Sequence, residues 1–569
     1  MTSSGNFPVL NHLKYKASSY TTSNIDAAGL QLGSTTGNAA QLNIGFKLGE
    51  GKFYWECYAA SIPGSLHFGV CIDNADLNNV TSGKAIIGMR ENGNKLVSTA
   101  PQTNSTSSSY GSSYASGGDI LAVAMDFTNS TMEFFINNSS QGSFSWSSAN
   151  DGSTYYPYLY MNTGVATMNT GQDSSFCSLK TAQGNTDENG FGDFYYAPPT
   201  GFLAMCSANL PTSDDIDAGG DNGADDNPSK QFGVLTWTGT GSSNALTGLG
   251  FAPDLCWIKK RNSSQAHVLM DTSRGTSEAV ESNSSGVADT NFTQGVTAFG
   301  TDGFTVGTHT QVNNSSDTYV GWCWKANGAT TASNSNGAIS SVVQANTKSG
   351  FSIVTFTGLA SSNFSSTVGH GLTKAPEFIV HKARDTGGSW WLQHVGLSAV
   401  TKVAALDGTG AENDLSSYGT LSAPTSSVFS VNGVEGIGGG GSARSYLTYC
   451  WHGVSGFSKF GRYIGNGNTD GPFISTGFRP RLLFLKRIDG SGSWLVSDSA
   501  RRPNNDGTYR ELYWNSDSAE ATGADSHDGV EYFSNGFKLK GSNAGCNGNG
   551  NKYIYGAWGD LSAKYNNGF

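Results

Sequence analysis

The sequence predicts an all-β protein made of tandem antiparallel β-sandwiches. Its 569 residues include 76 glycines, while charged residues make up only 14% and aromatic residues 11% of the chain. Apolar residues alternate with polar ones or stand in short runs between turn residues, and the spacing of an amphipathic helix is almost absent. These features are typical of turn-rich β-structure rather than of helical or disordered protein, and the length is enough for about four domains.

One sequence pattern occurs three times with different residues, at 250–260 (GFAPDLCWIKK), 375–382 (APEFIVHK) and 477–487 (GFRPRLLFLKR). Each copy has a proline, then an apolar run, then a basic residue. Proline lacks an N–H donor and has a fixed φ, so it suits the first residue of a strand. Four or five apolar residues in succession predict a strand that is buried on both faces.

A second stretch also occurs three times and ends in tryptophan, at 319–324 (YVGWCW), 446–451 (YLTYCW) and 553–558 (YIYGAW). About 70 residues separate the two stretches in each copy, as expected of a repeated domain. We therefore predict three copies of one β-domain. The predicted boundaries are residues 231–326 for repeat 1, 327–347 for a linker rich in Ala, Thr, Ser and Asn, 348–456 for repeat 2 and 457–569 for repeat 3.

Residues 1–211 do not share this repeat. Aromatic or alternating segments at 51–57, 68–70, 118–126 and 132–138 predict antiparallel strands separated by turns. The order and the sequences of these strands resemble those of the SPRY domain, a two-sheet sandwich of the concanavalin-like, jelly-roll kind. The resemblance runs from about residue 40 to about residue 180 and implies a SPRY-like sandwich at the start of the chain.

Two details of this region refine the resemblance. Tyr155-Tyr156-Pro157 matches the family's late Tyr-x-Pro strand, and Asn137-Asn138 stands where the family usually has an Asn-Gly turn. The second change is mild because Asn tolerates positive φ. Residues 189–199 look like a segment that accompanies SPRY domains in bacteriophage proteins, so the resemblance implies a phage context rather than eukaryotic signalling.

Residues 212–230 form a predicted acidic linker with six aspartates among Gly, Asn and Pro. Clustered carboxylates are typical of calcium loops, for which Asp214, Asp217 and Asp221 are the candidate ligands. The spacing lacks the bidentate Glu that closes an EF-hand loop. We therefore favour a solvated interdomain linker over a calcium site.

The three repeats resemble domains of unassigned function that recur in bacteriophage virion and tail proteins. Repeat 1 carries the likeness best, through residues 250–260, 271–275 (DTSRG), 302–306 (DGFTV) and 322–324. Repeat 2 lacks the Asp-Arg element of residues 271–275, and repeat 3 has it again at 498–501 (DSAR). The resemblance implies no catalytic residue.

Charge, hydropathy and cysteine positions limit the partners and the cellular compartment that we expect for this protein. The net charge of −11 and the lack of clustered Lys and Arg argue against a nucleic-acid partner. No apolar run is long enough to cross a membrane and the first residues lack a signal peptide's pattern, so we expect synthesis in the host cytoplasm and no membrane insertion. Cys323 and Cys450 occupy equivalent repeat positions where the third copy has Ala557, which indicates small buried thiols. We expect all eight cysteines to be reduced.

Candidate chemistry is sparse. The pairs Asp271/Arg274 and Asp498/Arg501 recur at one repeat position, which favours a structural ion pair or turn over a catalytic role. No acid pair suited to glycan hydrolysis stands out. We expect no enzyme activity, no cofactor and no metal site beyond the weak calcium candidates. The scattered histidines are interpreted as surface or turn residues: His267, His309, His370, His381, His394 and His452.

Binding residues are easier to propose. Residues 103–115 (TNSTSSSYGSSYA) form a Tyr/Ser/Gly loop, the composition that antibody loops use for contact, and Tyr110 and Tyr114 are its anchors. A flexible solvated loop is the equally weighted alternative. Trp390, Trp391 and Trp514 are candidate sugar-stacking platforms, although a core position is the more frequent role for tryptophan.

These resemblances and patterns lead us to expect a structural component of a tailed bacteriophage virion. The first hypothesis is a tail fibre or receptor-binding appendage that contacts a host cell-surface glycan or protein. The alternatives are a capsid decoration protein, such as a head fibre or knob, and a glycan-degrading tail spike. The expected partners are other virion proteins of the tail or capsid, and homo-oligomers are expected.

Overall fold

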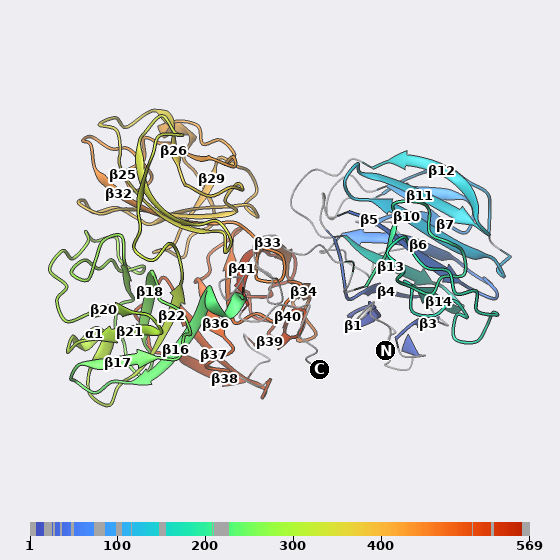
Figure 1. Cartoon of the computed structure of the whole chain (residues 1–569), viewed down its shortest axis with the longest axis horizontal. Coiled ribbons are helices and arrows are strands. Elements are labelled where there is room, and N and C mark those ends of the chain that lie inside the picture. The colour runs from blue at the N-terminus through green and yellow to red at the C-terminus, as the bar shows by residue number, and fades with distance from the viewer. Residues whose placement is uncertain are drawn as a thin grey trace. The chain divides into compact units, whose positions relative to one another are not determined.

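A computed structural model describes residues 7–15, 25–26, 29–34, 37–46, 51–72, 86–97, 105–114, 116–146, 155–206, 209, 227–502, 505–524 and 529–559. The chain divides into two compact units, residues 1–211 and 212–569 (Figure 1). Nearly all of the regular structure is antiparallel β-sheet, so the all-β prediction is confirmed. Across these described ranges, no helix has the length and apolar character that a membrane span requires.

Unit 1 is a sandwich of two sheets. The first has the order β1-β4-β13-β6-β7-β8-β9, and the second has the order β12-β11-β10-β5-β14-β3-β2, with β15 added beside β5. The strands are β1 (Leu10–Tyr15), β2 (Ile25–Asp26), β3 (Gln31–Ser34), β4 (Asn38–Leu42), β5 (Lys52–Tyr58), β6 (Leu66–Ile72), β7 (Ile86–Arg90), β8 (Asn94–Val97), β9 (Thr106–Ser109), β10 (Ile120–Asp126), β11 (Thr131–Ile136), β12 (Ser139–Ser145), β13 (Tyr155–Met161), β14 (Gly164–Asn169) and β15 (Leu203–Ala204).

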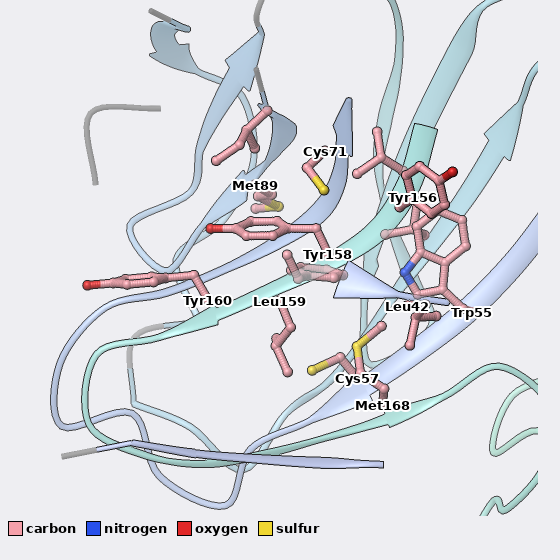
Figure 2. Packing of buried hydrophobic residues seen from close by; sticks show 14 of the residues in the cluster. Leu42, Trp55, Cys57, Cys71, Met89, Tyr156, Tyr158, Leu159, Tyr160 and Met168 are labelled. Atoms are coloured by element: carbon pink, nitrogen blue, oxygen red, sulfur yellow. The ribbon is translucent and has the colours of Figure 1, made fainter. Parts of the chain in front are cut away.

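The core of unit 1 lies between the two sheets. Leu42 and Leu159 come from the first sheet, and Trp55, Cys57 and Met168 come from the second; all five belong to one buried cluster (Figure 2). The segments of the sequence that predicted strands, such as β5 and β10, supply much of this cluster. Their burial explains why both strands are apolar along most of their length.

The hairpin between β11 and β12 has the turn that the sequence predicts. Ile136 pairs with Ser139, so the loop consists only of Asn137 and Asn138. Their φ angles are 46° and 65°. Both lie in the left-handed region that a type I′ hairpin turn requires, which Asn enters more readily than most residues.

Unit 2 contains the three repeats, and all three have the same central sheet. The orders are β16-β22-β18-β19, β25-β32-β27-β28 and β33-β41-β35-β36. The strands are β16 (Phe232–Thr238), β18 (Leu255–Lys260), β19 (Val268–Asp271) and β22 (Thr318–Trp324) in repeat 1; β25 (Phe351–Thr357), β27 (Phe378–Ala383), β28 (Trp391–His394) and β32 (Ser445–Trp451) in repeat 2; and β33 (Ser458–Ile464), β35 (Leu482–Arg487), β36 (Leu495–Asp498) and β41 (Lys552–Trp558) in repeat 3.

The register of these sheets also agrees. The closing tryptophan pairs with the third residue of the proline-led segment in each repeat: Leu255 with Trp324, Phe378 with Trp451, and Leu482 with Trp558. A proline stands two residues before each of these partners, at Pro253, Pro376 and Pro480. Strand order and register therefore have the threefold correspondence that the repeated sequence predicts.

Each repeat has a second, smaller sheet. The orders are β17-β21-β20, β26-β31 and β34-β40-β39. Each small sheet helps enclose a separate apolar cluster on one face of its central sheet, which we call the private cluster of that repeat. The strands are β17 (Asn244–Thr247), β20 (Val296–Gly300), β21 (Gly303–Val306), β26 (Ser365–Gly369), β31 (Val428–Asn432), β34 (Phe473–Ser475), β39 (Val530–Phe533) and β40 (Gly536–Leu539).

The opposite faces of the three central sheets share one core. Leu255 and Trp257 of β18 belong to this shared core, whereas Cys256 and Ile258 between them belong to the private cluster of repeat 1. The same alternation occurs in β27 and β35. A side-chain period of two thus distributes one fully apolar strand between two cores.

The three closing tryptophans meet in the shared core. The ring centroids of Trp324, Trp451 and Trp558 lie 5.5 to 5.9 Å apart, and each pair of rings is T-shaped. Edge-to-face contact is a favoured arrangement for aromatic rings and adds to the energy of their burial. The repeats are therefore three lobes of one folded unit, coloured green, yellow to orange, and red in Figure 1.

The predicted linker at 327–347 is wrong. It contains β23 (Ala332–Asn334) and β24 (Ser341–Asn346), and β24 pairs with β25 of repeat 2. The buried Asp254 carboxylate accepts the backbone N–H groups of Ala326, Gly328 and Ala329 at 2.7 to 3.0 Å. The small polar composition that predicted a linker is instead that of an ordered edge hairpin.

The remaining elements are short. In repeats 2 and 3 the central sheet is extended beyond β28 and β36 by two more strands each. These elements are η4 (Pro228–Lys230), α1 (Thr310–Asn313), β29 (Lys402–Ala405), β30 (Asn413–Asp414), η5 (Ser416–Tyr418), β37 (Thr508–Tyr513) and β38 (Ala521–Ala524).

Candidate functional site

The strongest candidate surface lies on unit 1 and includes one edge strand from each of its two sheets. β9 ends the first sheet and β12 ends the second. All four residues of β9 are exposed, as are most residues of β12. We call the surface formed by β9, residues 110–113 and β12 the polar edge.

Tyr110 joins the two edge strands. Its hydroxyl donates to the Gly142 carbonyl and accepts the Phe134 N–H at 3.3 Å. The Tyr110 ring packs edge-on against Phe144, with centroids 5.1 Å apart, and the Lys95 ammonium lies 5.5 Å from the Tyr110 ring. Tyr110 is half-buried, and burial raises the pKa of its hydroxyl. It is therefore an anchored residue with only part of its surface available to a partner.

Tyr114 is not a contact residue, which corrects the prediction. Its side chain is 1% exposed, and its hydroxyl lies 2.9 Å from the Met89 carbonyl and 3.2 Å from the Leu66 carbonyl. The Tyr/Ser/Gly composition concealed this role because Tyr114 closes the loop onto β6 and β7, far away in sequence. The surface that remains consists of Ser107, Ser108, Ser109, Ser112 and Ser113, beside Tyr110 and Lys95.

A hydrogen bond 2.8 Å long from the Ser112 N–H to the Gln141 side-chain oxygen connects the loop to β12. Hydroxyl groups both donate and accept, and the nearby lysine donates. The polar edge can therefore bind a neutral or weakly acidic polar partner by hydrogen bonding. The sequence did not indicate that Tyr114 lies in the core while Tyr110 is half-buried at the surface.

The tryptophans proposed as sugar-stacking platforms lie elsewhere. Trp390 and Trp514 are fully buried in the shared core of unit 2, where Trp514 stacks on Trp257 with centroids 4.4 Å apart. Trp391 is half-buried against the private cluster of repeat 2. Trp390 and Trp514 present no open ring face for a sugar because both are buried in the shared core, whereas Trp391 lies outside that core and is only partly covered.

Trp390 instead belongs to a ring of contacts between repeats. The residue fourteen positions after each leading proline is His267, Trp390 or Trp494. Each donates a ring N–H to a backbone carbonyl of another repeat, over 2.8 to 2.9 Å. His267 can donate from Nε2 because its Nδ1 accepts the Trp257 N–H. The order is cyclic: repeat 1 to Tyr513 of repeat 3, repeat 2 to Glu281 of repeat 1, and repeat 3 to Ala405 of repeat 2.

A second ring runs in the opposite direction. Asp271 accepts the Tyr449 hydroxyl of repeat 2 at 2.8 Å, and Asp498 accepts the Trp322 N–H of repeat 1 at 3.0 Å. His394, at the equivalent position in repeat 2, lies 3.1 Å from the Tyr555 carbonyl of repeat 3. Repeat 2 therefore replaces the Asp-Arg element with a histidine that still bridges to its neighbour.

The Asp-Arg pairs are structural, as predicted. Arg274 Nε lies 2.7 Å from Asp271 Oδ2 and Arg501 Nε lies 2.7 Å from Asp498 Oδ2, and all four side chains are buried. Burial acts to lower the pKa of Arg501, but the neighbouring carboxylates of Asp498 and Glu520 raise it above its ordinary value, so the guanidinium stays charged in the core. A fully paired buried ion pair is suited to holding two repeats in register.

The histidines were interpreted as surface or turn residues, and a surface position is wrong for five of the six. His309 is half-buried, but the other five are buried: His267, His370, His381, His394 and His452. Burial lowers the pKa of His267, His381 and His394 to about 3. These imidazoles are neutral hydrogen-bonding groups of the core, which the sequence could not indicate because no local pattern marks them.

The basic residue that follows each apolar run is also buried. Lys259, Lys382 and Lys486 are at most 1% exposed, and burial lowers the pKa of each to about 8. Their ammonium groups donate to backbone carbonyls; Lys486, for example, lies 2.7 Å from the Gly410 carbonyl of repeat 2. Lys259 and Lys486 bridge to a neighbouring repeat, whereas Lys382 donates to the Gly388 carbonyl of its own repeat, so none of the three forms a basic surface.

The calcium candidates Asp214, Asp217 and Asp221 lie outside the described residues. Among the residues that are described, no group of three His, Cys, Asp or Glu side chains is arranged to hold a metal ion.

The fold and the polar edge define an all-β protein with a SPRY sandwich followed by a three-lobed β-unit. The model of the SPRY domain matches residues 52–173, and the model of a domain of unknown function, DUF7483, matches residues 227–561. Because that second match covers more than half of the chain, the protein belongs to the DUF7483 family. One family model spans all three repeats, in agreement with their shared core.

Solved structures with a similar fold match only part of this chain. The SPRY domain of human HERC1 is 14% identical, with a TM-score of 0.20, and the match covers 28% of this chain and 91% of that one. The TRIM65 PSpry domain is also 14% identical, with a TM-score of 0.21 and coverages of 29% and 92%. The carbohydrate binding module CBM66 from Bacillus subtilis is 6% identical, with a TM-score of 0.21 and coverages of 29% and 94%. No curated protein matches the sequence.

Proposed function

We propose that this protein is a structural component of a tailed bacteriophage virion, serving as a tail fibre or receptor-binding appendage. The observation that carries the proposal is the structural difference between the two units. Unit 2 has one core shared by three interlocked repeats, which suits a rigid support. Unit 1 has an exposed polar edge of serines beside Tyr110 and Lys95, which suits recognition of a host cell-surface glycan or protein. The phage context itself rests on the sequence resemblances.

The proposed partners are other virion proteins and the host surface, with the chain acting as a homo-oligomer. A capsid decoration protein is the second candidate. The cyclic contacts favour it, since three related lobes around one core would present three similar surfaces to a threefold site on a capsid. A glycan-degrading tail spike is the third.

Locating the protein on intact particles tests the proposal directly. Gold-labelled antibodies against the purified chain should mark the tail of virions that carry it. Label spread over the capsid would support decoration instead. Particles that bind no label, despite containing the chain by mass spectrometry after disruption, would leave only a buried virion role and contradict an appendage.

Binding to host cells tests the recognition role. The fluorescently labelled full chain should bind cells of a permissive strain, and Ser107→Arg together with Ser109→Arg on β9 should weaken binding about tenfold or more. Val165→Arg is the matched control, because Val165 is 48% exposed on β14 of the same unit. Equal loss in both variants would remove the polar edge as the contact surface. Release of reducing sugar from host polysaccharide would instead identify a tail spike.

A further inference from the structure

Two cysteines of repeat 1 face each other across neighbouring strands. Cys256 on β18 pairs directly with Cys323 on β22, and their sulfur atoms lie 4.0 Å apart. Both side chains are fully buried in the private cluster of repeat 1. The eight cysteines are all thiols in the structure, so this contact is not a covalent bond.

The other repeats show that packing does not require two thiols here. The equivalent pair is Ile379 with Cys450 in repeat 2 and Leu483 with Ala557 in repeat 3. An aliphatic side chain opposite a small one fills the same place in the same register. The paired sulfurs of repeat 1 are therefore additional to what the fold needs at this position.

We propose that Cys256 and Cys323, which are expected to be reduced in the cytoplasm, form a disulfide once the protein meets an oxidising environment. Directly opposed residues of an antiparallel pair have Cα atoms about 4.5 to 5.5 Å apart, which lies within the range of about 4.4 to 6.8 Å that disulfides require. The strands already hold the two Cα atoms in place. Rotation of the side chains is enough to bring the sulfurs into bonding distance, with no shift of either strand.

A small-molecule disulfide such as oxidised glutathione is a sufficient oxidant. The Cys256 thiolate attacks one glutathione sulfur, which forms a mixed disulfide and releases one glutathione thiolate. The Cys323 thiolate then attacks the Cys256 sulfur, which forms the protein disulfide and releases the second glutathione thiolate. The two protons lost by the cysteines end on the two glutathione thiols, and the two electrons reduce the glutathione disulfide.

Burial controls the rate of this reaction. The apolar surroundings and the adjacent Cys323 raise the pKa of the Cys256 thiol well above its ordinary value, so the reactive thiolate is scarce in the folded core. Oxidation is consequently fast during folding or local opening and slow in the closed state. The bond closes a loop over residues 257–322, which includes β19, β20, β21 and α1. It should stabilise repeat 1 by restricting the unfolded chain.

The test is to refold the purified full chain in a mixture of oxidised and reduced glutathione. Remaining thiols are then alkylated with N-ethylmaleimide, and the peptides are mapped by mass spectrometry. We expect one disulfide, between Cys256 and Cys323, with the other six cysteines alkylated. The oxidised protein should unfold at a higher temperature than the same sample after dithiothreitol treatment.

Two variants provide matched controls. Cys323→Ala copies the residue of repeat 3 and should lose both the disulfide and the redox-dependent shift in unfolding temperature. Cys450→Ala removes the equivalent thiol of repeat 2 and should retain both. The peptide map of the unaltered protein does not depend on the folding of either variant. Eight alkylated cysteines after oxidative refolding, or a disulfide between any other pair, would overturn the proposal.

Discussion

Buried histidines make the stability of this protein sensitive to acid. Burial lowers the pKa of His67, His267, His381 and His394 to about 3 and that of His370 to about 4. An unfolded histidine has a pKa near 6.5. Below that pH, the unfolded chain binds protons that the folded chain excludes. The stability that these groups contribute is therefore complete above about pH 6.5 and declines as the pH falls toward the folded pKa values.

Two carboxyl groups, Glu56 and Asp407, act in the opposite direction, because burial raises the pKa of each. Burial raises the pKa of Glu56 to about 7, where its carboxyl contacts the N–H groups of Tyr195 and Tyr196. Between its unfolded pKa near 4.3 and pH 7, the folded state holds the extra proton, so stability falls as the pH rises. Two groups of this kind offset at most two of the five histidines.

The free energy of unfolding should therefore fall as the pH is lowered from 6.5 to 4.5. Each histidine contributes up to about 1.4 kcal/mol per pH unit. His394→Gln keeps a side-chain donor near the Tyr555 carbonyl but cannot titrate, so it should flatten this dependence by about one proton. Urea unfolding followed by tryptophan fluorescence at several pH values measures the slope. His309→Gln is the half-buried control and should change it less; an unaltered slope in His394→Gln would contradict the assignment.

At the scale of single residues, the sequence indicated the role of repeated residues better than the burial of individual side chains. The Asp-Arg pairs were correctly predicted as structural because their recurrence could be read directly. Tyr114 was misassigned because its burial depends on carbonyls of Leu66 and Met89, which no local pattern links to it. Composition alone does not say which side chain of a loop turns inward.

Two arginines at equivalent positions tie neighbouring lobes together. Arg384 of repeat 2 binds Glu278 of repeat 1 through two nitrogens, with Nε 2.7 Å from one carboxylate oxygen. Arg261 of repeat 1 binds Glu520 of repeat 3 in the same way, at 2.7 and 3.1 Å. The third position, Ile488 of repeat 3, cannot form such a pair. Two of the three boundaries therefore have a bidentate clasp.

Arg384→Met should lower the free energy of unfolding of unit 2 by about 2 to 3 kcal/mol, because Glu278 loses its best hydrogen bonds. Arg444→Met is the control on the same repeat. Arg444 lies 3.7 Å from Glu435, and its side chain is 33% exposed, so its loss should cost about 0.5 kcal/mol or less. Chemical denaturation of both variants gives the comparison. Similar losses would mean that the clasp contributes no more than a surface pair.

The segment after repeat 1 provides a test at the level of one element. Asp254 also accepts the Thr272 hydroxyl at 2.7 Å, so its carboxylate has four donors. Asp254→Ala should leave the N–H groups of Ala326 and Gly328 unpaired, whereas Ala329 keeps Gln344 as a second acceptor, and should cost about 3 kcal/mol. Amide exchange at Ala326 and Gly328 should become faster by tenfold or more.

Glu377 is the matched control, because it is the equivalent residue of repeat 2 and, among the described residues, its carboxylate accepts one hydrogen bond, from the Gly453 N–H at 3.2 Å. Glu377→Ala should leave exchange at residues 326–329 unchanged. If exchange there is already fast in the unaltered protein, the segment is a linker after all, as its composition first indicated.

At the scale of the whole molecule, the repeats could be predicted but their union could not. Proline-led apolar runs and closing tryptophans identified the central strands because they are both local and repeated. A strand that is apolar on both faces shows that both faces are covered, but not what covers them. Only the structure shows that Leu255, Phe378 and Leu482 point into one core rather than three.

A shared core predicts cooperative unfolding. Calorimetry of the full chain should show two transitions, one for each unit, rather than the four expected of a SPRY domain and three independent repeats. Trp451→Ala should destabilise unit 2 by about 3 to 5 kcal/mol, because it removes a fully buried ring that contacts both Trp324 and Trp558. This substitution should lower the temperature of the whole unit 2 transition, with no part of that transition remaining at its original temperature. Leu159→Ala in the core of unit 1 should shift only the other transition. If Trp451→Ala instead splits off a smaller transition for repeat 2, the three lobes fold separately and the rings of hydrogen bonds between them contribute little.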